Sequence, residues 1–496
     1  MPELPDINTI VLASVSDMTL ENAERVAFDR AVIELGAEAN AAIARGRVRF
    51  EAYVAQKGGY VYGSTTAPGS RAKVVLSEQE SRRQGETLRS FLALQAGPGG
   101  DMLSERCVRL AVFARLSNAM TGSGKLRPST AQAVADLLHA VPPVPMQAVA
   151  CSGEVMALTW LMAPLADLPL GVGEAMALIN GSPFATAMAC DVALTAGRRV
   201  KLAEQIFALS VEAAQCPEGH FDRRLADRWL DPYYRESLER LHRLLGGSKR
   251  KQMTHQSPTS WRVLPNVLAE ALRALAEASR AAQIGLQSLK DNPTFLQHAA
   301  DSEQDAVVSS GGYHDQRAAK AIDQVNSALT DLCVLASRHV AHLLDGGGLG
   351  LPPLLARAGD AVGAEYLAWG MTEPLATARR AAEATTLDVG LHDPAGNQSD
   401  IASLGFIAYG KHRAVARSFD ACLASLAMAA AFALEFRGLA PPSALLPLWG
   451  RLTKTAHSTV HRIDAVGEPL RNFQALLRAS CDDLPRADFA ESLRTP

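Results

Sequence analysis

Long stretches of the chain carry apolar side chains at helical spacing, and this pattern constrains the fold more than any other feature. Leu, Val, Ile and Ala recur three and four residues apart, as on the buried face of an amphipathic helix. The stretches cover residues 262–289, 315–344, 360–385 and 405–436. Helices of this kind bury their apolar faces against one another. The sequence therefore predicts an all-α fold, with a bundle of long helices and a smaller, loop-rich N-terminal region.

The N-terminal region is interrupted by Gly- and Pro-rich breakers, so its helices are expected to be short. We predict two domains, the N-terminal region over 1–195 and the long-helix region over 196–496. Residues 60–75 offer a candidate for a short β-ribbon, and the polar stretch 303–312 is predicted to be a loop. Pro374 is expected to kink or split the third long helix, because proline lacks a backbone N–H.

Charge and cysteine content narrow the classes of partner. The 496 residues hold 49 Lys and Arg against 52 Asp and Glu, so neither nucleic acid nor a membrane surface is indicated as a partner. The most apolar segment, 421–434, is shorter than the about 20 residues that span a bilayer. The 7 cysteines are scattered without C-x-x-C spacing, which argues against disulfides and a zinc cluster. With no signal-peptide pattern at the start, we expect a cytoplasmic protein without metal or nucleotide.

One tripeptide, Cys151-Ser152-Gly153, has the composition needed to build an electrophile from the backbone. The amide nitrogen of Gly153, unhindered by a Cβ, can reach back to the carbonyl of Cys151. Loss of water from the Ser152 side chain then leaves an exocyclic methylene. The product is 4-methylidene-imidazol-5-one (MIO). By itself the triplet also fits an ordinary turn, because Ser and Gly favour turns.

The other motifs of the chain decide between these two interpretations. They are the segments 61–69, 115–128, 177–181, 291–293, 310–314 and 397–405, in this order around the triplet at 151–153. In order and interval, the set resembles the aromatic amino acid ammonia-lyase family, which includes histidine and phenylalanine ammonia-lyases and related aminomutases. The resemblance runs from about residue 55 to 441. It implies the long-helix fold of histidine ammonia-lyase and a homotetramer whose active sites are shared between chains.

The resemblance also implies catalytic roles for particular residues. Cys151, Ser152 and Gly153 would form MIO autocatalytically, and Cys is compatible with the first position because only its carbonyl enters the ring. Tyr62 matches the family's catalytic base, which takes a proton from the substrate β-carbon. Asn180 matches the asparagine that hydrogen-bonds the carbonyl of the electrophile. It also fits a helix C-cap before Gly181, and the two roles are compatible. Tyr233 resembles the family's second active-site tyrosine.

The predicted substrate contacts contain the chain's main departures from the family. They are Gln95, Arg235, Tyr313, Gln398 and Ser399. Arg235 lies one position before the usual carboxylate-binding arginine. Ser399 stands where histidine enzymes have Glu and phenylalanine enzymes have Gln, and Gln95 belongs to the pair that selects the ring. Because a buried amide or hydroxyl needs a hydrogen-bond partner, we expect a polar or heteroaromatic side chain on the substrate. The rival hypothesis is that water satisfies these groups in a pocket that takes phenylalanine.

Three functions are compatible with these residues. The first is an MIO-dependent ammonia-lyase, which releases ammonia from an aromatic or histidine-like L-amino acid and gives an arylacrylate. The second is a 2,3-aminomutase, which returns the amine to the β-carbon. The third is a diverged relative that does not form MIO. It is kept open by Cys151 at the start of the triplet, by Glu154 in place of the usual Asp, and by the displaced Arg235.

Overall fold

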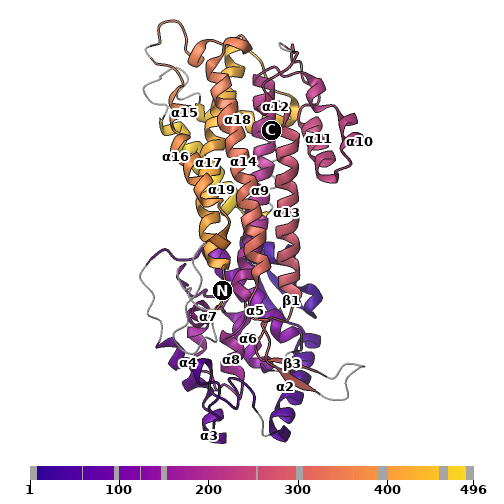
Figure 1. Cartoon of the computed structure of the whole chain (residues 1–496), viewed down its shortest axis with the longest axis vertical. Helices are drawn as coiled ribbons and strands as arrows, with labels where there is room; N and C mark the ends of the chain where they lie inside the picture. Colours follow the sequence, from indigo (N-terminus) through magenta and orange to yellow (C-terminus); the bar gives the residue numbers. More distant parts are fainter. Residues whose placement is uncertain are drawn as a thin grey trace, which may run out of the picture. The chain divides into compact units, whose positions relative to one another are not determined.

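The structure is a computed structural model, and it describes residues 8–57, 60–93, 100–122, 125–146, 153–252, 255–297, 305–360, 362–387, 400–456 and 467–486. Helices make up most of the described chain, which confirms the predicted all-α class (Figure 1). The helices are α1 Leu20–Phe28, α2 Ala37–Lys57, α3 Glu78–Ser81, α4 Gln84–Leu92, α5 Glu105–Met120, α6 Pro128–Asp136, α7 Val155–Met162, α8 Glu174–Ile179, α9 Pro183–Ala213, α10 Ala226–Trp229, α11 Pro232–Leu244, α12 Thr259–Arg262, α13 Leu264–Gln287, α14 Gln316–Asp345, α15 Tyr366–Trp369, α16 Thr372–Ala381, α17 Gly405–Phe436, α18 Leu446–Ala456 and α19 Gly467–Asp482. The strands are β1 Thr9–Leu12, β2 Val32–Leu35, β3 Thr294–Leu296 and β4 Ala306–Val308.

The chain divides into two compact units that do not follow the sequence in one block each. Unit 1 comprises Met1–Asp191, Ala278–Ala321 and Ala384–Gly410, and unit 2 comprises Val192–Glu277, Ile322–Glu383 and Lys411–Pro496. The long helices α9, α13, α14 and α17 each contribute to both units. Because whole helices are shared in this way, the predicted division into 1–195 and 196–496 stays a prediction.

Unit 1 is organised around α5, which is buried on every side from Cys107 to Met120. Ser104 caps its N-terminus by accepting from the Cys107 amide. The helix packs against α1 and α6, while β1 and β2 pair in parallel, with Thr9 opposite Val32. A buried helix of this kind can direct polar side chains into the interior, and α5 does so with Arg115 and Asn118.

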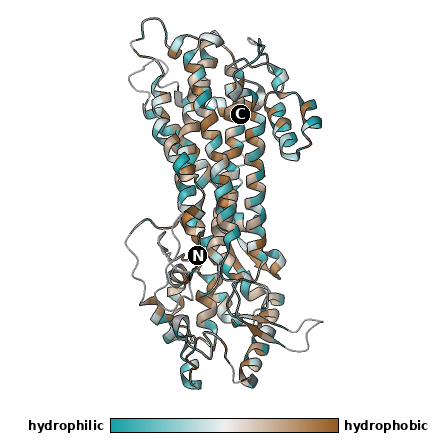
Figure 2. Ribbon diagram, viewed as in Figure 1, coloured by the Kyte–Doolittle hydropathy of each residue, from teal (hydrophilic) through white to brown (hydrophobic). Residues whose placement is uncertain are grey.

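Unit 2 contains most of the long-helix bundle. Within it, Arg199 of α9 forms bidentate ion pairs with Asp420 of α17 and Asp482 near the end of α19, at N–O distances of 2.9–3.0 Å. The Arg199 side chain is 3% exposed and that of Asp420 is 1% exposed. Both apolar and polar residues occur along the long helices (Figure 2), as expected of amphipathic helices. The three-way ion pair thus joins three helices at one buried point.

Two segments are long and apolar enough to cross a membrane by composition, Glu174–Ala213 and α17. These segments are longer than residues 421–434, the stretch judged from the sequence to be too short to span a bilayer. In the structure, 94% and 78% of their apolar windows are buried inside the protein. Core helices of a bundle pass the same test, so this composition is explained by burial in the protein itself.

The structure confirms one local prediction, the split near Pro374, and corrects two others. The helix predicted at 360–385 is split before Thr372, and Pro374 lies in the first turn of α16, where a missing N–H breaks no helical bond. The predicted ribbon at 60–75 contains only an isolated bridge between Thr66 and Val75 among its described residues. The loop predicted at 303–312 includes β4, which pairs with β3 in antiparallel fashion.

The buried ion pairs of Arg199 predict a large loss of stability when the cation is removed. In Arg199→Met, Asp420 keeps its burial and loses its bidentate partner, with Arg478 left 3.9 Å away. Breaking a buried pair in this way typically costs about 3–5 kcal/mol. Arg82→Met is the control, because Arg82 and Glu78 are 72% and 81% exposed and such pairs contribute about 1 kcal/mol or less. Chemical unfolding of both variants measures the difference, and equal losses would contradict this account.

Candidate active site

Gly153 and the ring of Tyr313 are packed directly against each other in unit 1. A Cβ added to Gly153 would lie 3.2 Å from Cδ2 of Tyr313. The position therefore accepts a side chain only if the ring moves. Of the predicted triplet, Gly153 is described, whereas Cys151 and Ser152 lie outside the described residues.

The residue after the triplet, Glu154, is anchored on the N-terminus of α9. Its buried carboxylate accepts hydrogen bonds from the amides of Phe184, at 2.6 Å, and Ala185, at 2.7 Å. The first amides of a helix have no intrahelical acceptor and favour a negative group. Burial raises the pKa of Glu154 to about 8, against the effect of these amides and of Lys290. The change from Asp to Glu noted in the sequence therefore has a structural role as a helix cap.

Lys290 and Asp315 complete a buried charged cluster with Glu154. The Lys290 ammonium group lies 3.5 Å from the Asp315 carboxylate and contacts the hydroxyl of Thr186 in the first turn of α9. Burial lowers the pKa of Lys290, while the charges of Asp315 and Glu154 oppose that shift. Sequence reasoning missed Lys290 and Asp315. The available signal was their position, since each lies directly beside one of the family-like motifs, 291–293 and 310–314.

Asn180 lies in the turn between α8 and α9 and is 6% exposed. Its side-chain amide donates to the carbonyl of Asn292 at 2.8 Å, and its own carbonyl accepts from Arg115 of α5 at 2.6 Å. It is also the C-cap residue of α8, so the structural interpretation made from the sequence is correct. Gly181 follows with φ +135°, and a Cβ there would lie 2.6 Å from the carbonyl of Lys290, which explains the Asn-Gly pair.

Tyr62 lies in a compact loop whose hydrogen bonds converge on the Val61 carbonyl. Its phenolic oxygen accepts from the amide of Gly69 at 2.8 Å. The adjacent Gly63 has φ +66°, and a Cβ on it would lie 2.7 Å from Cγ of Met176. The sulfur of Met176 in turn lies 3.6 Å from the side-chain nitrogen of Asn180. Met176 thus brings the loop of the predicted base next to the predicted asparagine.

Tyr233 and Arg235 are described in unit 2, on α11. The helix begins with Pro232 and is capped by Asp231, which accepts from the Tyr233 amide at 2.9 Å. The ring of Tyr233 lies 4.8 Å from the guanidinium carbon of Arg273. Arg235 pairs with Asp227 at the surface. Their catalytic and substrate-binding roles stay predictions. The remaining predicted residues, Gln95, Gln398 and Ser399, lie outside the described residues.

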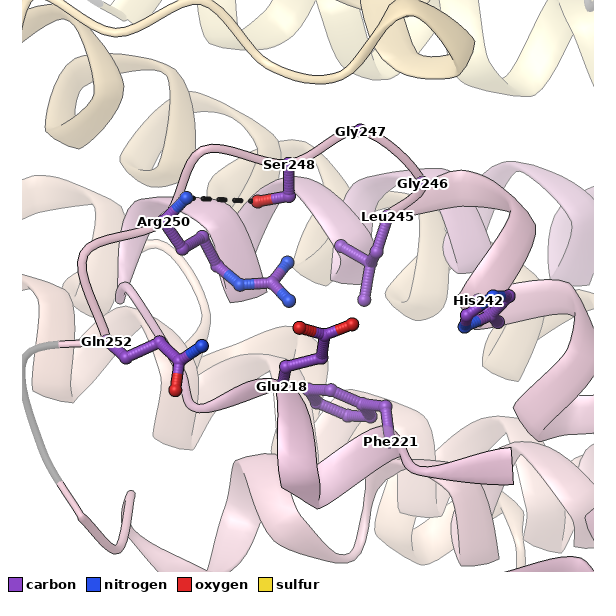
Figure 3. A pocket seen from close by; sticks show the side chains of 9 residues that line it. All are labelled: Glu218, Phe221, His242, Leu245, Gly246, Gly247, Ser248, Arg250 and Gln252. Carbon is purple, nitrogen blue, oxygen red and sulfur yellow. Dashed lines mark hydrogen bonds between the residues drawn. The ribbon is translucent and has the colours of Figure 1, made fainter. Parts of the chain in front are cut away.

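A cavity of about 210 Å³ lies in unit 2, between the end of α11 and the turn that contains Glu218 (Figure 3). Its lining includes Phe221, His242 and Arg250, and the Arg250 amide donates to the Ser248 hydroxyl at 3.3 Å. None of the predicted site residues lines this cavity. The Arg250 guanidinium is occupied by an ion pair with the buried carboxylate of Glu212.

Comparison with known proteins identifies the family. The sequence pattern described as aromatic amino acid lyase matches residues 18–462. The chain belongs to the aromatic amino acid lyase family. A histidine ammonia-lyase of Burkholderia mallei (strain NCTC 10229) is 27% identical over 481 residues, which are 90% of this lyase and 92% of that protein. Such relatives make it a carbon–nitrogen lyase, and the resemblance seen in the sequence is confirmed.

Solved structures of the family share the fold of this lyase. Ergothionase of Treponema denticola, an ergothioneine degrading enzyme, superposes with a TM-score of 0.85 at 17% identity, over 95% of this chain and 99% of that one. Tyrosine aminomutase of Streptomyces globisporus superposes with a TM-score of 0.82 at 22% identity, over 96% of each chain. At these identities the comparison establishes the fold and leaves the substrate open.

The raised pKa of Glu154 predicts how Glu154→Gln changes stability with pH. A carboxyl group whose folded-state pKa is raised stabilises the protein at low pH, and that contribution is lost as pH rises from about 4.5 toward 8. The neutral amide has no such dependence. The melting temperature of Glu154→Gln should therefore rise relative to wild type between pH 5 and pH 8. Glu373→Gln, an exposed position in α16, is the control and should follow wild type. A Glu154→Gln difference that shrinks with rising pH would contradict the assignment.

Proposed function

We propose that this protein is an MIO-dependent ammonia-lyase, which eliminates ammonia from an aromatic or heteroaromatic, histidine-like L-amino acid to give an arylacrylate. The observation that carries the proposal is the convergence in unit 1 of Gly153 with Tyr313, and of the Tyr62 loop with Asn180. Membership in the aromatic amino acid lyase family supports the reaction class.

The surroundings of Gly153 fit formation of the MIO group. Ring closure requires a third residue without a side chain, and a side chain at Gly153 would have to displace the Tyr313 ring. The hydrogen bonds of Glu154 hold the chain immediately after the triplet in place. Tyr313 and Asn180 are the described residues that would border the group. Once formed, the group supplies an electrophile for the substrate amine, which amino-acid side chains do not provide.

The proposed chemistry of the chain's own residues begins at Tyr62. Its phenolate takes a proton from the substrate β-carbon, the electron pair of that C–H bond forms the new double bond, and the bond from the α-carbon to nitrogen breaks to release ammonia. The Gly69 amide, which donates to the Tyr62 oxygen, stabilises negative charge there. The side-chain amide of Asn180, fixed by the Asn292 carbonyl, is a preorganised dipole for charge that develops nearby.

The substrate class follows from Gln95 and Ser399. A pure hydrocarbon ring would leave both polar groups unsatisfied, at about 1–3 kcal/mol each. We therefore propose a substrate whose side chain carries hydrogen-bonding atoms, such as an imidazole or a modified imidazole. We further propose a cytoplasmic homotetramer with shared active sites, as the family resemblance implies, which light scattering at micromolar concentration tests.

The first test is the mass of the purified protein and of its tryptic peptides. We expect loss of two waters, localised to the peptide that contains Cys151-Ser152-Gly153. A panel of aromatic amino acids then follows, monitored for acrylate absorbance and for β-amino acids, and an imidazole substrate should be turned over faster than L-phenylalanine. An unmodified triplet would overturn the MIO mechanism. β-Amino acid as the main product would assign a 2,3-aminomutase instead.

Tyr62→Phe tests the proposed base with minimal change in packing. Loss of a general base typically reduces kcat by about 10²–10⁴-fold, and the melting temperature should change little because only one hydroxyl is removed. Tyr60→Phe is the matched control, because Tyr60 is two residues away in the same segment and 60% exposed. Wild-type kcat in Tyr62→Phe would exclude this tyrosine as the base.

A further inference from the structure

Lys290 lies in the buried charged cluster with Glu154, the residue after Gly153, although no motif contains it. Its side chain is 9% exposed, and its ammonium group contacts the Thr186 hydroxyl and lies 3.5 Å from the Asp315 carboxylate. Thr186 belongs to the same first turn of α9 that Glu154 caps. The Lys290 side chain is therefore connected to the residue that follows the triplet.

The main chain of Lys290 is connected to the other side of the site. Its amide donates to Asn118 Oδ1 at 2.9 Å, and its carbonyl accepts from Asn118 Nδ2 at 2.6 Å. Two residues later, the Asn292 carbonyl accepts from the side chain of Asn180. The Lys290 carbonyl also packs under Gly181, where a Cβ would lie 2.6 Å away. The Asn180 side chain is thus bonded to the segment that begins at Lys290, and Asn118 holds the main chain of Lys290 in place.

Asp315 extends the same connection to Tyr313. It lies two residues beyond Tyr313, whose ring packs on Gly153. Ser310, three residues before Tyr313, donates its amide to the Asn292 side chain at 3.0 Å. One end of the Tyr313 segment is therefore paired with Lys290 itself, and the other end is bonded to Asn292, two residues after Lys290.

The Lys290 ammonium group is closely packed, and Gly285 leaves the space that it occupies. Gly285 of α13 faces it, and a Cβ there would lie 3.0 Å from Lys290 Nζ and 2.7 Å from the Thr186 hydroxyl. The charged and titratable groups near the ammonium group are Glu154, Asp315 and Cys190, and burial raises the pKa of the Cys190 thiol to about 12. Two carboxyl groups and one ammonium group thus share a site with no bulk solvent.

We propose that Lys290 is a positioning residue of the lyase site, which holds the Glu154 anchor, the Tyr313 segment and the Asn180 turn in one fixed arrangement. The inference rests on the proposed function. It concerns geometry, because Lys290 acts through the residues that border the site.

The test is Lys290→Met, which keeps the length of the side chain and removes its charge. Misplacement of catalytic groups by about 1 Å costs about 10²-fold in rate. We normalise kcat to the fraction of protein whose triplet is dehydrated, which peptide mass measures. This kcat should fall about 10- to 100-fold. KM should change less than about 3-fold, because the substrate contacts remain. Lys290→Arg should recover part of the loss. In the double variant Lys290→Met with Asp315→Asn, the fold-decrease in kcat should be smaller than the product of the fold-decreases of the two single variants. The reason is that the double variant also removes the carboxylate that Lys290→Met leaves unpaired.

The control is Arg250→Met, which breaks a similarly buried ion pair with Glu212 in unit 2. It should lower the melting temperature and leave kcat unchanged. If Lys290→Met retains wild-type kcat, or if the double variant shows no coupling, the proposal is overturned.

A second pair of variants applies if Lys290→Met does not fold. Gly285→Ala places a methyl group against the ammonium group without removing charge, whereas Gly197→Ala, on α9, meets no atom within 4 Å. We expect kcat to fall in Gly285→Ala only, and equal kcat in both would overturn the proposal. An undehydrated triplet in the wild-type protein would instead overturn the proposed function, and the role of Lys290 with it.

Discussion

The carboxylate of Glu154 on the first turn of α9 is the interaction on which the candidate site depends. It joins the residue after the triplet to the N-terminus of α9, through two short hydrogen bonds to Phe184 and Ala185. A buried carboxylate is costly unless amides or cations compensate it. The helix N-terminus supplies the amides and Lys290 supplies the cation. Removing any of these partners disfavours the charged form of Glu154 and raises its pKa further, so the local backbone and the electrostatics are fixed together.

Close packing of the backbone segments is the second constraint on the candidate site, and glycine residues make this packing possible. Gly63 lets the Tyr62 loop approach Met176, and Gly181 lets the Asn180 turn approach the Lys290 carbonyl. Both have positive φ, which side-chain-bearing residues rarely adopt. Gly153 meets the Tyr313 ring. At each of these glycines a methyl group would push apart a predicted site residue and the segment packed against it. The glycines of the motifs therefore permit close packing as well as turn formation.

Much of the fold and part of the site follow from the sequence. Apolar spacing predicted α13, α14 and α17 with nearly correct ends, because long amphipathic helices repeat one local signal many times. The split of the helix predicted at 360–385 also follows from the sequence, because Pro374 fits the first turn of α16 and is unfavourable in a helix interior. The strand β4 was missed, because its three residues depend on pairing with β3. Tyr62, Asn180 and Gly153 were predicted from motifs, and the structure places them in one unit.

The amino-acid sequence by itself determined the helical class, the family and the chemical groups available, because these depend on local periodicity and on residue types at fixed spacing. Only the tertiary structure decided that Lys290 and Asp315 belong beside Glu154, and that Met176 joins the Tyr62 loop to Asn180. Glu154 and Lys290 are far apart in the chain, and nothing local marks a buried lysine as the partner of a distant carboxylate. Their pairing follows from the folding of α9, α13 and the 290–315 segment around one point, where desolvation makes every unpaired charge expensive.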